Sequence, residues 1–178
     1  MVNVNDFIDE LSSLLSKIDS EVDHIEKELV ATKKPIHSFV RGENVPGVYV
    51  FFIKPKLEIN IYGFEDKWID KKIINYPKIV RSRFQVSTQE KKETYTLYLG
   101  KSEKVDSRIN EHLTHTSQIT TYSLKLIDRL ELIKDNDLYY SRYEMKELVG
   151  LDSSIIQFVI TRIESKLRSK MNPWVGKQ

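Results

Sequence analysis

Cysteine is absent from this 178-residue chain, which excludes disulfide bonds and any metal site built on thiolate ligands. The four histidines are scattered and form no cluster of the kind that binds zinc. No stretch approaches the roughly 18 consecutive apolar residues of a membrane-spanning helix, and the polar, acidic start is unlike a signal peptide. We therefore expect a soluble, unprocessed protein in a reducing cytoplasm, with no membrane partner.

The chain as a whole has little excess charge, but its parts differ. It contains 28 Lys and Arg against 26 Asp and Glu, a net charge of +2. Residues 1–33 hold eight acidic residues and three lysines, so the remaining residues carry a net charge of +7. Because positive surfaces attract polyanions, we expect function to lie in this basic part.

Apolar residues recur at helical spacing from residue 4 to residue 31 and predict one amphipathic helix. Its apolar stripe consists of Phe7, Leu11, Leu14, Ile18, Val22, Ile25 and Leu29. Lys34 and Pro35 follow and end the helix, so residues 1–34 form an N-terminal element of their own. This helix either packs across its own domain or pairs with a second copy in a homodimer.

Residues 35–178 predict one α+β domain with a small antiparallel or mixed sheet between helices. Residues 48–53 and 95–99 are apolar, β-rich runs next to Gly47 and Gly100, and they predict two strands of that sheet. The other expected elements are a helix from Ser102 to about Thr116, a strand at 121–127, a hairpin that pairs 130–133 with 138–143, and a final helix that begins at Ser153 or Ser154 and stops before Pro173.

Residues 54–94 separate the two strands and predict an insertion, which could extend the sheet through 57–62. The insertion is rich in basic residues, namely Lys67, Lys71, Lys72, Lys78, Arg81 and Arg83. Three aromatic residues, Trp68, Tyr76 and Phe84, lie between them. This mixture suits contact with phosphates and stacking on bases. The alternative is a solvated loop whose aromatic side chains anchor it to the core.

Two short motifs occupy the predicted strands: Gly47-Val48-Tyr49 in the first and Tyr98-Leu99-Gly100 in the second. Three further residues stand at set intervals. Arg108 follows Tyr98 by ten residues, His112 follows Arg108 by four, and Glu164 precedes Pro173 by nine. The motifs and the three intervals together resemble the GIY-YIG nuclease family, over residues 45–126 without the insertion and over 155–176.

The resemblance implies a compact, restriction-endonuclease-like member with five catalytic residues: Tyr49, Tyr98, Arg108, His112 and Glu164. Glu164 would be the ligand of one divalent ion, Mg²⁺ or Mn²⁺. Arg108 would stabilise the transition state, since guanidinium stays charged and grips two phosphate oxygens. Tyr49 would activate the water, with His112 as proton acceptor, and Tyr98 would bind a phosphate oxygen or position the attacking group.

The expected activity is therefore metal-dependent hydrolysis of DNA phosphodiester bonds, as in a restriction or defence nuclease. Substrate contacts are expected from Lys101, Lys71, Lys72, Lys78, Arg81 and Arg83. One position departs from the family, because Gly176 stands where an asparagine often follows the proline by three residues. The alternative function is an inactive nucleic-acid-binding module of the same fold, and a third is a structural or regulatory partner protein organised by the N-terminal helix.

Overall fold

A four-stranded antiparallel sheet forms the centre of the computed structural model, which describes residues 4–58, 60–70 and 72–176. The strand order is β1 (Lys34–Pro35), β5 (Asn136–Glu144), β2 (Gly47–Pro55) and β4 (Tyr95–Ser102). β2 pairs with β5 and β4 along its length and is buried on both faces, which explains its unbroken apolar run. The predicted α+β class is confirmed.

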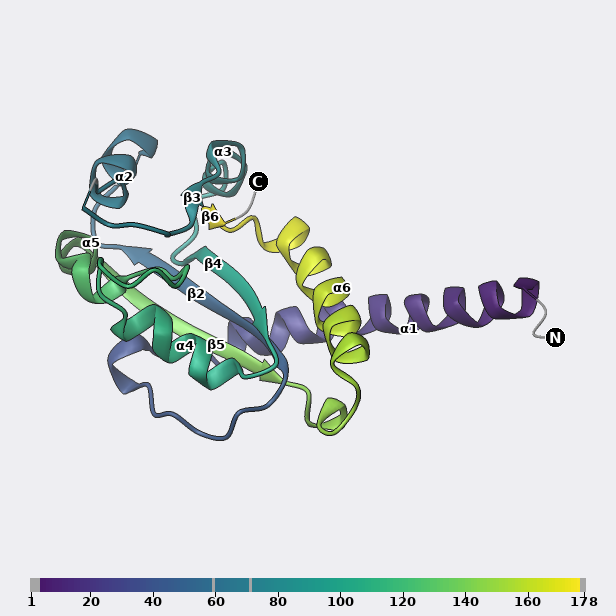
Figure 1. Ribbon diagram of the computed structural model, residues 1–178. Coiled ribbons are helices and arrows are strands. Elements are labelled where there is room, and N and C mark those ends of the chain that lie inside the picture. Colours follow the sequence, from purple (N-terminus) through teal and green to yellow (C-terminus); the bar gives the residue numbers. More distant parts are fainter. Residues whose placement is uncertain (1–3, 59, 71, 177–178) are drawn as a thin grey trace.

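Helices cover both faces of the sheet (Figure 1). α4 (Val105–Thr114) and α5 (Leu130–Asp135) lie on the face to which β2 directs Tyr49, Phe51 and Ile53. α1 (Val4–Ala31) and α6 (Ser153–Met171) lie on the other face, against Val48, Val50 and Phe52. The alternation of side chains along β2 thus divides them between two apolar cores. Short 3₁₀ turns join these elements at η1 (Ile36–Ser38), η2 (Leu126–Asp128) and η3 (Lys146–Leu148).

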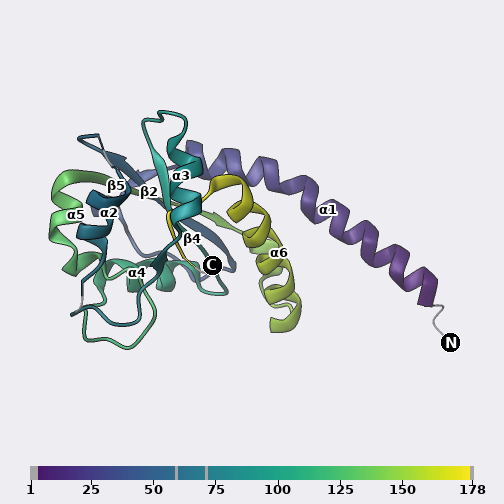
Figure 2. The ribbon, with the colours of Figure 1, turned by 90° about the horizontal axis from the view of Figure 1, so that it is seen from above.

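The long N-terminal helix is confirmed, but only its second half packs on the domain. Ile18, Val22, Ile25 and Leu29 are buried against the sheet and α6. Leu11 and Leu14 of the same stripe are 36% and 47% exposed, and the side chain of Phe7 lies outside the described part of the structure. The first half of α1 projects away from the body (Figures 1 and 2). The predicted packing of this helix on its own domain therefore holds for its second half only.

Ion pairs fix α6 along α1. Arg162 donates to both carboxylate oxygens of Asp19, at 2.8 and 2.7 Å, and Lys166 lies 2.9 Å from the same carboxylate. Lys170 pairs with Asp23 and with Glu26 one turn further on. α6 begins at Ser153, capped by Asp152, and ends before Pro173, as predicted.

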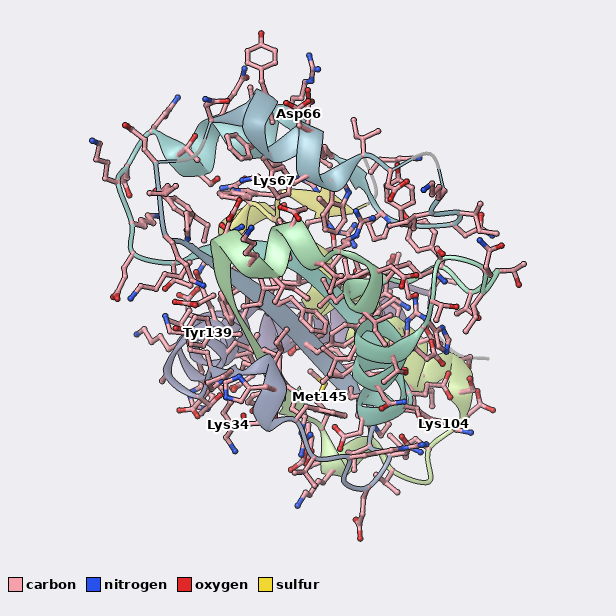
Figure 3. The ribbon with its side chains drawn as sticks, turned by 90° about the vertical axis from the view of Figure 1, so that its left-hand side faces the viewer. Lys34, Asp66, Lys67, Lys104, Tyr139 and Met145 are labelled. Atoms are coloured by element: carbon pink, nitrogen blue, oxygen red, sulfur yellow. The ribbon has the colours of Figure 1, made fainter. Side chains whose placement is uncertain are left out.

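The insertion folds as α2 (Ile61–Trp68), β3 (Lys78–Ile79) and α3 (Arg81–Thr88). Trp68, Tyr76 and Phe84 are all buried in the core, so the anchoring interpretation holds for them and the base-stacking interpretation is wrong. The guanidinium of Arg129 lies 3.8 Å from the centroid of the Trp68 ring and fixes the insertion to the domain. Lys67 points from α2 toward α5, where it pairs with Asp135 at 2.6 Å (Figure 3).

A second contact joins the insertion to the end of the chain. β3 pairs with β6 (Val175–Gly176), so that Ile79 lies opposite Val175. The expected extension of the sheet through 57–62 is wrong, because β2 ends at Pro55 and Asn60 caps α2 by accepting a hydrogen bond from the Gly63 amide.

Two further expectations are wrong. No strand forms at 121–127 in the described chain, because side chains satisfy the polar backbone groups there. Lys125 Nζ donates to the carbonyl of Thr121, and Arg129 Nε donates to the carbonyl of Leu124. Residues 130–133 are not one arm of a hairpin but part of α5, where Leu132 is buried. Residues 130–133 make only about one helical turn, with Glu131 among three apolar residues, and are too short for their spacing to distinguish helix from strand.

Of the helices in the described part of the chain, none combines the length and apolar composition needed to cross a membrane.

Candidate active site

The two glycine-tyrosine motifs lie side by side in the sheet. Tyr49 of β2 is directly opposite Gly100 of β4, and the ring centroids of Tyr49 and Tyr98 are 6.1 Å apart. A Cβ atom at Gly100 would lie 2.5 Å from Tyr49 Oη and 2.9 Å from Tyr98 Cε1. Glycine at this position therefore lets both tyrosine rings occupy one side of the sheet.

The first motif glycine is required by a backbone contact. A Cβ atom at Gly47 would lie 2.1 Å from the carbonyl oxygen of Tyr143, in the neighbouring strand β5. No side-chain rotation relieves such a contact. Gly47 thus allows β2 to lie close against β5, and this sets the position of Tyr49 two residues later.

His112 lies behind Tyr49 and is fully buried in α4. Its Nε2 is 2.9 Å from Tyr49 Oη, and its Nδ1 accepts a hydrogen bond of 2.9 Å from the Leu124 amide. Because Nδ1 accepts, the proton of the neutral ring must be on Nε2. His112 therefore donates its hydrogen bond to Tyr49.

Burial decides the charge states of both groups. It lowers the pKa of His112 well below the ordinary value of 6.5, and the positive charge of Arg108 lowers this pKa further. Burial raises the pKa of Tyr49 well above its ordinary value, and the contact with the Tyr98 hydroxyl raises it more. The expectation that His112 accepts a proton from Tyr49 is therefore wrong, since the only basic nitrogen already accepts from Leu124.

The depressed pKa of His112 predicts that folding stability falls in acid. Below pH 6.5 the unfolded chain binds a proton at this residue that the folded chain does not bind, so stability is present above that pH and is lost as the pH falls. The free energy of unfolding should drop by about 1.4 kcal/mol per pH unit from this residue alone. Urea denaturation at a series of pH values measures the slope.

His112→Gln, which can still donate and accept, should remove this contribution to the slope. The same change at His37, which is exposed, is the control for the substitution itself. An unaltered slope in the His112 variant would contradict the assignment of a buried neutral ring.

Arg108 lies one turn before His112 on α4. Its Nη1 donates to Glu111 and its Nη2 donates to the carbonyl of Tyr122. Burial opposes its charge, but Tyr49, Glu111 and Tyr98 together raise its pKa. α4 begins at Val105, after Ser102 Oγ accepts a hydrogen bond from the Lys104 amide, and this short connection from β4 brings Arg108 next to Tyr98.

Glu164 reaches the same place from α6, which packs against the edge strand β4. A pocket of about 780 Å³, here called the tyrosine pocket, is lined by side chains that include Tyr49, Tyr98, Arg108, Tyr122, Glu164 and Arg168. Four of the five predicted catalytic residues thus face one cavity, and His112 holds Tyr49 from behind. The Glu164 carboxylate, largely buried, accepts a hydrogen bond from Arg168.

The predicted substrate contacts divide into three groups. Lys101 lines the tyrosine pocket, and its Nζ donates to Gln157 at 2.6 Å. Lys78 and Arg83 lie beside residues of the pocket. The Lys78 backbone contacts the Tyr122 side chain. Burial and then the nearby charge of Arg168 lower the pKa of Arg83.

The remaining predicted contacts do not join this site. Arg81 makes a two-point ion pair with Glu65, at 2.6 and 2.7 Å. Lys72 lines a different cavity, and Lys71 lies outside the described residues.

Sequence reasoning missed Tyr122 and Arg168 as pocket residues. The four-residue interval from Glu164 to Arg168 is a usable signal, because it places both side chains on one face of a helix. Tyr122 lies on an irregular segment, and nothing in its surrounding sequence marks it.

The chain matches no family model, and no curated protein or solved structure matches it. The site is therefore interpreted from its own residues and geometry.

A divalent cation fits the tyrosine pocket only with help from a substrate. No three His, Asp or Glu side chains gather to form a metal site in the described residues. Glu164 nevertheless holds a cation already, the guanidinium of Arg168. One carboxylate, completed by water and phosphate oxygens, is a donor set that Mg²⁺ accepts. Glu164 is therefore suited to hold Mg²⁺ or Mn²⁺ together with a phosphate.

In the part of the chain that the structure describes, no nearby side chain takes the place of the asparagine that members of the GIY-YIG family often have at the position of Gly176. Gly176 has a φ of 154°, which residues with a side chain rarely adopt. Asn172 ends α6 and lines another cavity.

Proposed function

We propose that this protein is a metal-dependent endonuclease of GIY-YIG type that hydrolyses DNA phosphodiester bonds. The observation that carries the proposal is the tyrosine pocket. Residues separated by up to 115 positions, Tyr49, Tyr98, Arg108 and Glu164, line one cavity. Two phenols, one guanidinium and one carboxylate are the groups needed to position a water, to bind a phosphate and to hold a divalent cation.

Arg108 would bind the non-bridging oxygens of the scissile phosphate. Its charge persists at any cellular pH, and its planar fork matches two phosphate oxygens. Glu111 and the Tyr122 carbonyl hold the guanidinium at the pocket before substrate arrives. This arrangement lowers the cost of ordering the side chain in the transition state.

The two tyrosines would form a relay for the proton of the attacking water, with His112 holding Tyr49 in position. Tyr49 Oη accepts a hydrogen bond from His112 and also contacts Arg108 and the Tyr98 hydroxyl. When Arg108 donates to the phosphate instead, the second lone pair of Tyr49 would be free for the water, and the proton of Tyr49 would point to Tyr98. As the water attacks phosphorus, its proton would pass to Tyr49, the Tyr49 proton to Tyr98, and the Tyr98 proton to the solvent in the pocket.

Mg²⁺ or Mn²⁺ held by Glu164 would supply charge neutralisation at the phosphate and at the leaving oxygen. Basic side chains extend the site beyond the tyrosine pocket. A second cavity of about 400 Å³ shares Lys101 and Arg108 with it and is also lined by Lys104. Lys78 lies near Tyr122, and Arg83 lies near Arg168. A polynucleotide backbone crossing the site would therefore meet positive charge beyond the pocket.

The test is incubation of supercoiled and linear DNA with the purified protein, in Mg²⁺ or in chelator. Cleavage that needs the metal and is lost in Tyr49→Phe would support the proposal. The principal alternative is an inactive nucleic-acid-binding module, which Gly176 favours. Salt-sensitive binding without cleavage of any substrate would select that alternative. A cytoplasmic location is part of the proposal.

The proposed function predicts a homodimer formed through α1. One active site cuts one strand, so cleavage of both strands of a duplex favours two copies of the protein. The exposed side chains Val4, Ile8, Leu11 and Leu14 continue the stripe that is buried further along the helix. Leu11→Asp with Leu14→Asp should convert a dimer into a monomer, measured by sedimentation equilibrium. Nicking of one strand should persist, while double-strand cleavage should fall.

Val40→Asp is the matched control, since Val40 is 77% exposed and lies outside the helix. It should leave the dimer intact. A wild-type protein that stays monomeric at micromolar concentration would contradict the dimer.

A further inference from the structure

Arg168 occupies the carboxylate that the proposed metal needs. It lies four residues after Glu164 on α6, and its Nη2 donates to Glu164 Oε1. Both side chains line the tyrosine pocket, and both are largely buried, with exposed fractions of 22% for Arg168 and 11% for Glu164. An ion pair between two such groups is far less exposed to water than the usual pair along a helix surface.

A guanidinium and a divalent cation cannot both be bound closely to this carboxylate without repulsion. In a partly buried pocket this repulsion is weakly screened. Binding of Mg²⁺ or Mn²⁺ at Glu164 therefore requires that Arg168 weaken or leave its contact. The protein alone should bind the metal poorly.

The tyrosine pocket itself offers Arg168 a second partner. Arg168 lines the pocket together with Arg108, so a phosphate that enters it meets both guanidinium groups. Guanidinium binds phosphate through paired, charge-assisted hydrogen bonds. In the proposed nuclease, a phosphate of the substrate would therefore attract Arg168 away from Glu164.

We propose that Arg168 couples metal binding to DNA binding: it pairs with Glu164 in the free protein and moves to a substrate phosphate when DNA enters. This inference rests on the proposed function and adds a positioning residue to it. The carboxylate becomes available to the metal only when DNA is present. Because binding free energies are reciprocal, the metal must strengthen DNA binding by the same factor.

The test measures Mn²⁺ affinity with and without a DNA duplex, in the Tyr49→Phe background so that the duplex survives. Electron paramagnetic resonance reports free Mn²⁺ directly. The same titration with Glu164→Gln and duplex gives the ions that DNA binds by itself, which are subtracted. In the Tyr49→Phe parent, DNA should raise the affinity by about tenfold, within the usual range of coupling.

Arg168→Gln should raise the Mn²⁺ affinity of the free protein by about tenfold and remove the effect of DNA. It should also weaken DNA binding in chelator. Arg162→Gln is the matched control: it lies on the same helix and pairs with a carboxylate, Asp19, but does not line the pocket. That variant should retain the metal affinity and the DNA effect of the parent.

If Arg168→Gln binds Mn²⁺ no more tightly than the parent, or keeps the DNA effect, the inference is wrong even though the wild type cleaves DNA. If the wild type cleaves none of the substrates and binds no DNA, the proposed function fails first. Circular dichroism of each variant confirms that α6 remains helical, so a change in affinity is not a loss of fold.

Discussion

Glu164→Gln is expected to lower the rate of metal-dependent DNA cleavage by about 10²- to 10³-fold, the loss seen when a single charge-stabilising group is removed from an active site. Glutamine keeps the size of the side chain but removes its negative charge. Its side chain is 11% exposed and faces the tyrosine pocket, and no other carboxylate on the described lining can take its place. Single-turnover cleavage of a labelled duplex, in Mg²⁺ and in Mn²⁺, measures the effect.

The affinity of Glu164→Gln for DNA should not fall with its cleavage rate. Removing the carboxylate also frees Arg168 from its ion pair and takes a negative charge out of the pocket, so affinity for DNA in chelator should be retained or increased. Asp19→Asn is the matched control, because Asp19 also pairs with an arginine of α6 but lies on α1. It should cleave at the wild-type rate. Wild-type cleavage by Glu164→Gln would place the metal elsewhere or remove it from the reaction.

The elements that sequence predicted best are those with long or strongly bounded patterns. The helix at Val4–Ala31 follows from eight turns of apolar spacing, and β2 follows from an apolar run that begins at Gly47. α5 and its surroundings were predicted wrongly for a physical reason. A four-residue segment such as 130–133, with three apolar residues, fits a strand and a helix equally, and tertiary contacts such as the burial of Leu132 decide between them.

The position of β5 could not be predicted from local pattern either. This strand pairs with β2 along nine residues that precede it by more than 80 positions, so Tyr49 lies opposite Arg142 as well as Gly100. The pairing also explains the need for glycine at position 47, which packs on the Tyr143 carbonyl. Such close approaches depend on which strands become neighbours, and spacing along the chain does not specify this.

The candidate site divides in the same way. The resemblance to the GIY-YIG family implied that Arg108 and His112 share a site with the strand tyrosines, and the structure brings them together: Arg108 lines the pocket with both tyrosines and His112 contacts Tyr49. The direction of the hydrogen bond between His112 and Tyr49 could not be predicted, because it is set by the amide of Leu124 on an irregular segment. The same limit applies to Tyr122, whose carbonyl holds Arg108. The residue types of the site could be predicted from the sequence. Their protonation states and the backbone groups that hold them could not.

Gly100→Ala is expected to lower the rate of cleavage strongly by displacing the two tyrosines, without changing any charged group. The added methyl carbon would lie 2.5 Å from Tyr49 Oη and 2.6 Å from Tyr49 Cζ, far inside van der Waals contact. Tyr49 is 1% exposed and its ring packs against Phe51 and His112, so it cannot move aside at low cost. Overpacking of a filled core costs about 1–3 kcal/mol of folding free energy.

Cleavage should therefore fall by at least about 10²-fold, because a displacement of about 1 Å at a catalytic group has that effect. Gly63→Ala is the matched control. Gly63 lies within α2, where the nearest atom to an added Cβ is Asn60 Oδ1 at 3.6 Å, and alanine should stabilise this helix by up to about 1 kcal/mol. Thermal melting and single-turnover cleavage are measured on both variants. Since Cζ alone is too close, Tyr49→Phe should not relieve the instability of Gly100→Ala. A double variant as stable as Tyr49→Phe alone would show that the ring does not lie against Gly100.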